Sequence, residues 1–217
     1  MPMSNYLKNL LVTFLVLGIG ACQSVPKPEP QALPEPVVEA ISEPVEVIDV
    51  DQKNYEAALV ALKAGEILFA IELLEQVRIS APELEHVFTN LGLAYFKQKN
   101  YDNAELAFQQ AIDSNPNDAI AYNHLGIIKR LQGQFDSARK TYQKAIQIDN
   151  RYASAYLNLG ILYDIYLQDL EKALQQYKKY QALTSDESNS VGKWIVDIQR
   201  QLKTVKTVKT VKTDTQG

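Results

Sequence analysis

Apolar and small residues recur along the middle of the chain at an interval of 34 residues. The pair Leu-Gly occurs at Leu91-Gly92, Leu125-Gly126 and Leu159-Gly160. Ala104 and Ala138 fall 34 residues apart at a second position of the same register. A fixed period of this length is typical of arrays whose repeats are helix pairs, each of which buries its apolar face only against its neighbours. The pattern therefore predicts an all-α solenoid.

The repeat register can be laid down with starts at Asp51, Glu85, Ala119 and Ala153. The second unit shows it most clearly, with Phe88, Leu91, Gly92, Tyr95, Ala104, Phe108, Ala111 and Pro116 in order. This order resembles the tetratricopeptide repeat (TPR) family. The resemblance implies an array of about four helix pairs, and binding to other proteins as the function of the fold.

Two details of local packing follow from the register. Gly92, Gly126 and Gly160 fall inside predicted helices, where glycine is unfavourable, so they predict close helix packing, with Ala70, Ala104 and Ala138 in the facing contact. In the fourth unit the small residue is Ala173, one place later than the period demands. We therefore expect one extra residue in the turn 167–170.

Behind the last pair, apolar residues at helical spacing predict a capping helix over 189–202, which seals the array. They are Val191, Trp194, Ile195, Ile198 and Leu202. The predicted array with its cap therefore covers residues 51–202. Residues 203–217 begin with three Lys-Thr-Val repeats and have no apolar face to pack, so we expect this end to be disordered.

The first residues have the layout of a secretory signal peptide over 1–21, with Lys8 ahead of a short apolar run. Cys22, the single cysteine, follows small residues, which resembles the lipobox of bacterial lipoproteins and implies a lipidated, membrane-anchored N-terminus. Gln23 after it implies the outer membrane, by resemblance to enterobacterial sorting. A plain secretory signal with a free thiol is the alternative. Residues 22–50 are rich in Pro and Glu and predict an extended linker.

Chemistry-bearing motifs are missing from the sequence. There are two histidines and one cysteine, and no phosphate-binding loop, zinc-protease motif or nucleophile elbow. We therefore expect no catalysis, no cofactor and no metal. The formal net charge of -4 and the pI of about 5.3 disfavour nucleic acid as a partner.

The family resemblance implies that the first helix of each pair lines the concave face of the array. Its sixth position falls on Asn90, His124 and Asn158, a candidate polar ladder for the backbone of an extended peptide. Beside the ladder we expect a partly apolar floor from Leu93, Phe96, Ile127 and Ile161, with Arg130 as a basic contact. The ladder residues could equally brace neighbouring helices, and the apolar residues could be ordinary interhelix core.

The function predicted from these features is a lipid-anchored scaffold on the periplasmic face of the outer membrane that binds a segment of another envelope protein. The chain is similar to two kinds of bacterial lipoprotein, pilotins of secretin and pilus assembly and adaptors that recruit peptidoglycan hydrolases. The alternative is a structural tether between the outer membrane and the cell wall, with possible self-association of the repeats.

Overall fold

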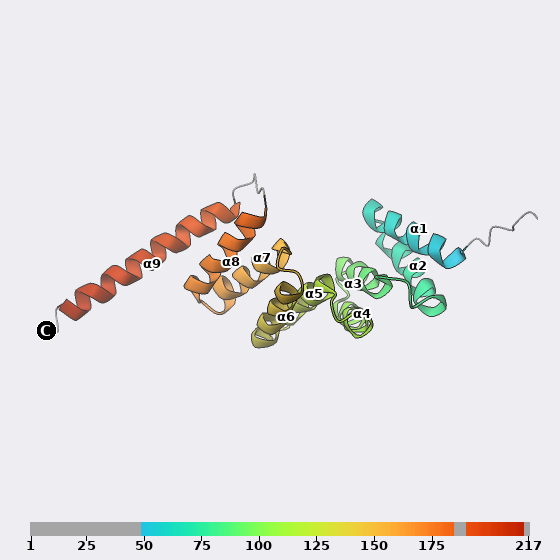
Figure 1. Ribbon diagram of the computed structural model, residues 1–217, viewed down its shortest axis with the longest axis horizontal. Coiled ribbons are helices and arrows are strands. Elements are labelled where there is room, and N and C mark those ends of the chain that lie inside the picture. Colours follow the sequence, from blue (N-terminus) through green and yellow to red (C-terminus); the bar gives the residue numbers. More distant parts are fainter. Residues whose placement is uncertain (1–48, 185–189, 215–217) are drawn as a thin grey trace, which may run out of the picture. The chain divides into compact units, whose positions relative to one another are not determined.

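The computed structural model describes residues 49–184 and 190–214, and all regular secondary structure in these ranges is helical. The elements are α1 (Val50–Ala64), α2 (Ile67–Ser80), α3 (Val87–Lys97), α4 (Tyr101–Ser114), α5 (Ala119–Leu131), α6 (Phe135–Ile148), α7 (Ala153–Ile161), the π-helical segment η1 (Leu162–Tyr166), α8 (Leu170–Leu183) and α9 (Ser190–Asp214). The described part of the chain thus confirms four helix pairs followed by a further helix (Figure 1).

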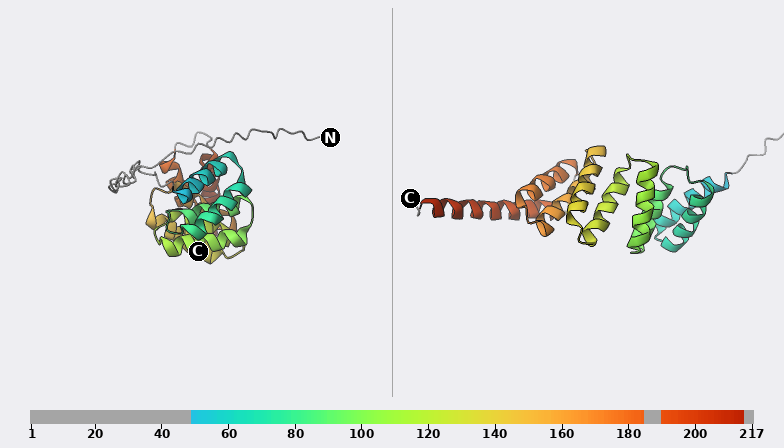
Figure 2. Two further views of the ribbon diagram at one scale, coloured as in Figure 1. Left: turned by 90° about the vertical axis from the view of Figure 1, so that its right-hand side faces the viewer. Right: turned by 90° about the horizontal axis from the view of Figure 1, so that it is seen from below.

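Each helix packs against the next one along the chain, so the pairs follow one another in sequence order (Figure 2). The first helices also contact one another across repeats, α1 with α3, α3 with α5 and α5 with α7. The buried side chains fall into clusters that cross the repeat boundaries, such as Leu73 and Leu74 of α2 with Leu91 and Ala94 of α3. No pair therefore has a core of its own, and the array is stable as a stack.

In the second, third and fourth pairs a helical glycine lies in close contact with the second helix of the pair. A Cβ atom on Gly92 would lie 2.6 Å from Cε1 of Phe108, and one on Gly126 would lie 2.6 Å from Cε1 of Tyr142. Gly160 stands in the same relation to Tyr177. The prediction of close packing at the glycines is confirmed. The atoms nearest to each added Cβ belong to an aromatic ring of the second helix, a contact that the register did not predict. Ala70, Ala104 and Ala138 are fully buried.

A left-handed residue connects the two helices of every pair. These residues are Gly65, Lys99, Gly133 and Gln168, and their φ angles are 83°, 64°, 75° and 52°. They are spaced by 34, 34 and 35 residues along the sequence. In the first three pairs the next residue donates its N–H to a carbonyl five positions back, at 2.8–2.9 Å, as in a Schellman motif.

The longer last interval identifies where the fourth pair carries its extra residue. The N–H of Leu167 donates to the carbonyl of Leu162 at 3.0 Å, a five-residue step that defines the π-helical segment η1. The extra residue therefore lies inside the first helix, as a π-turn. The prediction that it lies in the turn 167–170 was wrong. An insertion in a helix is accommodated in this way because only one hydrogen-bond step has to widen.

The last helix, α9, is longer than the predicted capping helix. Val191, Ile195 and Ile198 are buried and join the cluster around Tyr177, which confirms the cap. The helix then continues to Asp214, over most of the segment that we expected to be disordered. Lysine is a good helix former, threonine and valine cost only tenths of a kcal/mol, and no Gly or Pro interrupts the run, so a helix nucleated by the packed cap can propagate.

Gly126→Ala tests the contact between glycine and aromatic ring. Tyr142 is fully buried, so its ring can move away from a new Cβ atom only by displacing other core atoms. We expect the free energy of unfolding to fall by about 1–2 kcal/mol, because overpacking outweighs the ~1 kcal/mol gain in helix propensity. Urea unfolding of Gly126→Ala, Tyr142→Leu and the double variant measures the coupling. Leucine at position 142 should relieve much of the steric clash with the alanine at position 126. If the effects of the two substitutions on the free energy of unfolding simply add, the proposed contact is contradicted.

Candidate functional site

The first helices share one face, here called the first-helix face, which contains register positions 5, 6, 9, 12 and 13 of each repeat. Asn90, at position 6 of the second repeat, donates from Nδ2 to the hydroxyl of Tyr55 at 2.8 Å. Tyr55 is position 5 of the first repeat, and its hydroxyl donates to the carbonyl of Glu85 at 2.9 Å. The amide of Asn90 is thus committed to a bond between α3 and α1.

The same arrangement recurs between the third and fourth repeats. Asn158 donates from Nδ2 to Oδ1 of Asn123 at 2.9 Å, and Nδ2 of Asn123 lies 3.4 Å from the hydroxyl of Tyr152. Asn123 is only 2% exposed. Both ladder asparagines therefore brace neighbouring first helices, which is one of the two roles that the sequence left open for them.

The corresponding bond between the second and third repeats runs through Thr89 and Asp118. The hydroxyl of Thr89 donates to Oδ2 of Asp118 in a short hydrogen bond, and Oδ1 of Asp118 accepts the N–H of Ala121 at 2.9 Å as the N-cap of α5. Tyr55, Thr89 and Asn123 are 34 residues apart. This second polar column could have been read from the repeat register, but the sequence analysis missed it.

His124 is the one ladder residue with a different role. Its ring stacks on Phe108, with centroids 5.3 Å apart, and meets Phe96 edge-on at 5.4 Å. Its Nδ1 atom is shielded from solvent and has no hydrogen-bond partner among the described residues. Burial lowers the pKa of His124 to about 4, although the Asp118 carboxylate acts in the opposite direction. The imidazole is consequently neutral at pH 7 and packs as an aromatic ring.

The predicted floor residues line the first-helix face at intermediate exposure, between the core and solvent. Leu93 and Phe96 pack against the core cluster that contains Phe108, whereas Ile127 and Ile161 pack against the one that contains Tyr177. They form the edge of the interhelix core and also present part of their surface outward. Both readings of these residues therefore hold in part.

Arg130 belongs to a cluster that the sequence did not reveal. Its Nη1 donates to the hydroxyl of Tyr166 at 3.0 Å, and its guanidinium lies 5.4 Å from the centre of the same ring. Phe135 lies against Tyr166 with ring centroids 4.9 Å apart. Tyr166 ends the π-turn and remains 39% exposed. Only the displaced register of the fourth repeat hinted at an unusual structure here.

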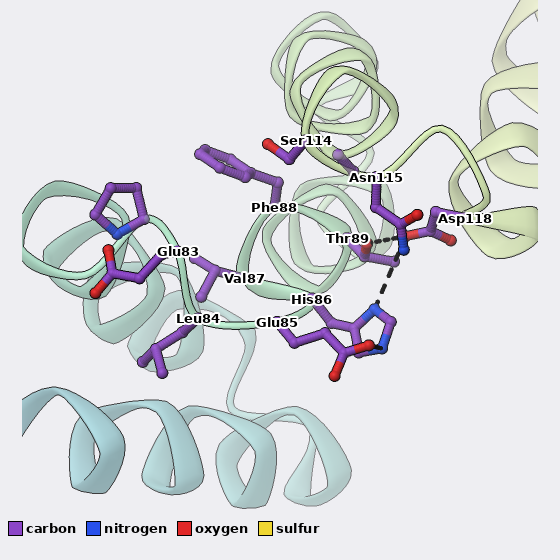
Figure 3. Close-up of a pocket in the computed structure, with 12 residues that line it drawn as sticks. Glu83, Leu84, Glu85, His86, Val87, Phe88, Thr89, Ser114, Asn115 and Asp118 are labelled. Atoms are coloured by element: carbon purple, nitrogen blue, oxygen red, sulfur yellow. Dashed lines mark hydrogen bonds and ion pairs between the residues drawn. The ribbon is translucent and has the colours of Figure 1, made fainter.

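A cavity of about 380 Å³ lies where the turn between the first two pairs meets the end of α4. In Figure 3, His86, Thr89 and Asp118 point toward one another on one side, and Phe88 lies on the other. Nδ1 of His86 is 3.9 Å from Oδ2 of Asp118, and His86 has a left-handed backbone with φ of 66°. None of the predicted ladder residues lines this cavity.

Two further properties bear on the kind of site present. Among residues 49–184 and 190–205, no three His, Cys, Asp or Glu side chains come together as metal ligands. None of the helices that the structure describes is both long and apolar enough to span a bilayer. Cys22 and the segments 1–21 and 22–48 lie outside the described residues, so the predictions of lipidation and of an extended linker remain predictions.

Stacked helix pairs with a glycine–aromatic contact define an α-solenoid of protein-binding type. The chain belongs to the tetratricopeptide repeat family, which matches residues 55–119, 89–153 and 132–188 and so more than half of its length. The comparison with curated proteins gives no match.

The similar solved structures include several of the protein MamA. MamA from Desulfovibrio magneticus RS-1, from residue 41 to its end, is 21% identical, with a TM-score of 0.55 over 61% of this chain and 75% of that one. A second MamA structure is 19% identical, with a TM-score of 0.57 over 70% and 88%. A third is 21% identical, with a TM-score of 0.55 over 73% and 96%. At these identities the likeness establishes the fold.

His124 should make the stability of the array dependent on pH. Its folded-state pKa of about 4 lies below the ordinary 6.5, so the unfolded chain binds the proton first and stability is lost as the pH falls from 6.5 toward 4. We expect this group to remove about 2 kcal/mol of the free energy of unfolding between pH 7 and pH 5. Urea unfolding at the two values, with His124→Asn as the comparison, measures it. An equal loss in the variant would refute the assignment.

Proposed function

We propose that the protein is a non-catalytic scaffold whose first-helix face binds a segment of another protein. The observation that carries this proposal is the cluster of Arg130, Phe135 and Tyr166, which leaves an aromatic ring exposed on a face that the bracing bonds hold rigid. Aromatic and arginine side chains on a preformed surface are the groups that most often anchor bound peptides. Membership of the tetratricopeptide repeat family supports the same function.

The second part of the proposal is where this scaffold acts. The signal-like residues 1–21, the lipobox-like position of Cys22 and the Pro- and Glu-rich linker favour a lipid-anchored protein on the periplasmic face of the outer membrane. Its partner would then be an envelope protein, either a secretin or pilus component or an enzyme of peptidoglycan metabolism. These assignments rest on the sequence and are tested separately from the binding face.

A photoreactive phenylalanine analogue at Tyr166 tests binding at the first-helix face in intact cells. Tyr166 is exposed and aromatic, so this replacement conserves most of its packing. We expect a discrete covalent adduct with one protein, to be identified by mass spectrometry. The matched control is the same analogue at Leu106, which is 65% exposed on the second helix α4 and should give no such adduct. Adducts only with a second copy or with wall fragments would favour the tether instead.

Metabolic labelling with an alkyne fatty acid tests the anchor. We expect label on the wild-type chain and complete loss of label in Cys22→Ser, because this is the only thiol that can be acylated. Density fractionation of the labelled membranes then separates the outer from the inner membrane. A chain that is exported and cleaved but carries no label would support the plain secretory signal.

A further inference from the structure

One row on the first-helix face has no role in holding the array together. It consists of Lys63, Lys97 and Leu131, at register position 13 of the first three repeats, and of Ile165 in the π-turn of the fourth. We call it the edge row. Because the π-turn adds one residue, Tyr166, two places before the left-handed Gln168, is the structural equivalent of Leu131, and Ile165 lies directly beside it. Leu131 is 51% exposed and Ile165 is 63% exposed, and both lysines are exposed. Within the described ranges no ion pair or hydrogen bond engages the side chain of Lys63 or Lys97.

The edge row changes character halfway along the array. Its first two members are cations and its last two are large apolar side chains, so charge and hydrophobicity are separated by repeat. A lysine in the last turn also stabilises the helix C-terminus, which gives Lys63 and Lys97 a local use. Leu131 and Ile165 have no such use, and neither belongs to a core cluster of the described residues.

The apolar half of the row lies next to the cluster of Arg130, Phe135 and Tyr166, in which the ring of Tyr166 remains 39% exposed. Ile165 directly precedes Tyr166, and Leu131 directly follows Arg130. The hydrogen bond and the ring contact between Arg130 and Tyr166 hold the tyrosine in place, and the ring of Phe135 packs against it as well. A fixed ring beside two exposed aliphatic side chains is the kind of surface on which proline-rich and apolar segments dock.

The distance between neighbouring members of the edge row determines which backbone conformation of a bound peptide can contact all of them. Neighbouring first helices contact each other, and packed helices lie about 8–10 Å apart, so four successive positions span roughly 24–30 Å. A polyproline II segment repeats every three residues with a rise of ~3.1 Å per residue, which presents one side chain about every 9 Å on the same side. Its period matches the period of the array.

We infer that the edge row is the docking line for an extended, polyproline-like segment of a partner protein, with two acidic residues followed by two apolar residues at three-residue spacing. This inference rests on the proposed scaffold function and specifies the partner class for the same face. The acidic residues pair with Lys63 and Lys97, and the apolar ones pack on Leu131, Ile165 and the ring of Tyr166.

The direct test is fluorescence anisotropy of the full chain with synthetic peptides. The probe has the order Glu-Pro-Pro-Glu-Pro-Pro-Leu-Pro-Pro-Leu, and a second probe has it reversed because the direction of docking is free. A reference peptide carries lysine in place of glutamate. We expect one of the glutamate probes to bind at least tenfold more tightly than the reference, with affinity falling as salt increases.

Variants of the protein separate docking from folding. Lys63→Glu with Lys97→Glu should weaken the glutamate probe at least tenfold and should gain affinity for the lysine reference peptide, a reversal that a damaged fold cannot produce. Leu131→Asp with Ile165→Asp should weaken both probes. The controls are Lys53→Glu and Ile79→Asp, which change exposed residues of α1 and α2 outside the row and should leave binding unchanged.

Several outcomes would overturn the inference. Equal binding of the glutamate and lysine peptides would show that the edge row does not bind the peptide. Binding that the edge-row variants leave unchanged would show the same. A partner that crosslinks to Tyr166 equally well in the Lys63→Glu, Lys97→Glu variant would refute the row and leave the scaffold function standing. The absence of any adduct at Tyr166 would refute the scaffold function itself.

Discussion

The close contact between a helical glycine and an aromatic ring is the constraint on which the rest of this array depends. Phe108, Tyr142 and Tyr177 each occupy the space that a Cβ atom would need on the preceding helix, and all three are almost fully buried. The ring fixes the distance and rotation of the two helices in a pair. Because each pair then presents the same surfaces to its neighbours, the next pair can stack in the same way and the first helices fall side by side.

Polar residues complete the stacking where the first helices meet. Three equivalent positions, Tyr55, Thr89 and Asn123, each bond to the following repeat, and two of them also accept an amide from Asn90 or Asn158. Buried polar groups are costly unless they are paired, so each bond favours one register of stacking over any shifted one. At the middle boundary His124 replaces the amide with a ring contact, which makes that boundary the one sensitive to acid.

The sequence predicts those features of the structure whose positions follow from regular spacing along the chain. The 34-residue period locates the helix pairs and the glycines, because core positions must recur with the repeat, and the helical spacing of apolar residues locates the capping residues Val191, Ile195 and Ile198. It could not locate the π-turn, since an extra residue before Ala173 fits a wider helix step or a longer loop equally well. It also could not assign Asn90 and Asn158, because an amide on this face can bond either to a neighbour or to a ligand, and only the distances to Tyr55 and Asn123 decide.

Asn90 and Asn158 at position 6 are engaged in bonds between repeats, so the surface available to a partner lies toward the ends of the first helices. Removing the amide of Asn158 would leave the oxygen of buried Asn123 without its donor, at a cost of about 1–3 kcal/mol, so this side chain is not free to serve a changing partner. At position 13 neither Lys63 nor Lys97 makes a side-chain bond within the described residues, and Leu131 is half exposed. The π-turn adds Tyr166 at this same edge, beside Arg130. The one irregular element of the array thus lies where the chain can vary its surface without disturbing the bonds that hold the repeats together.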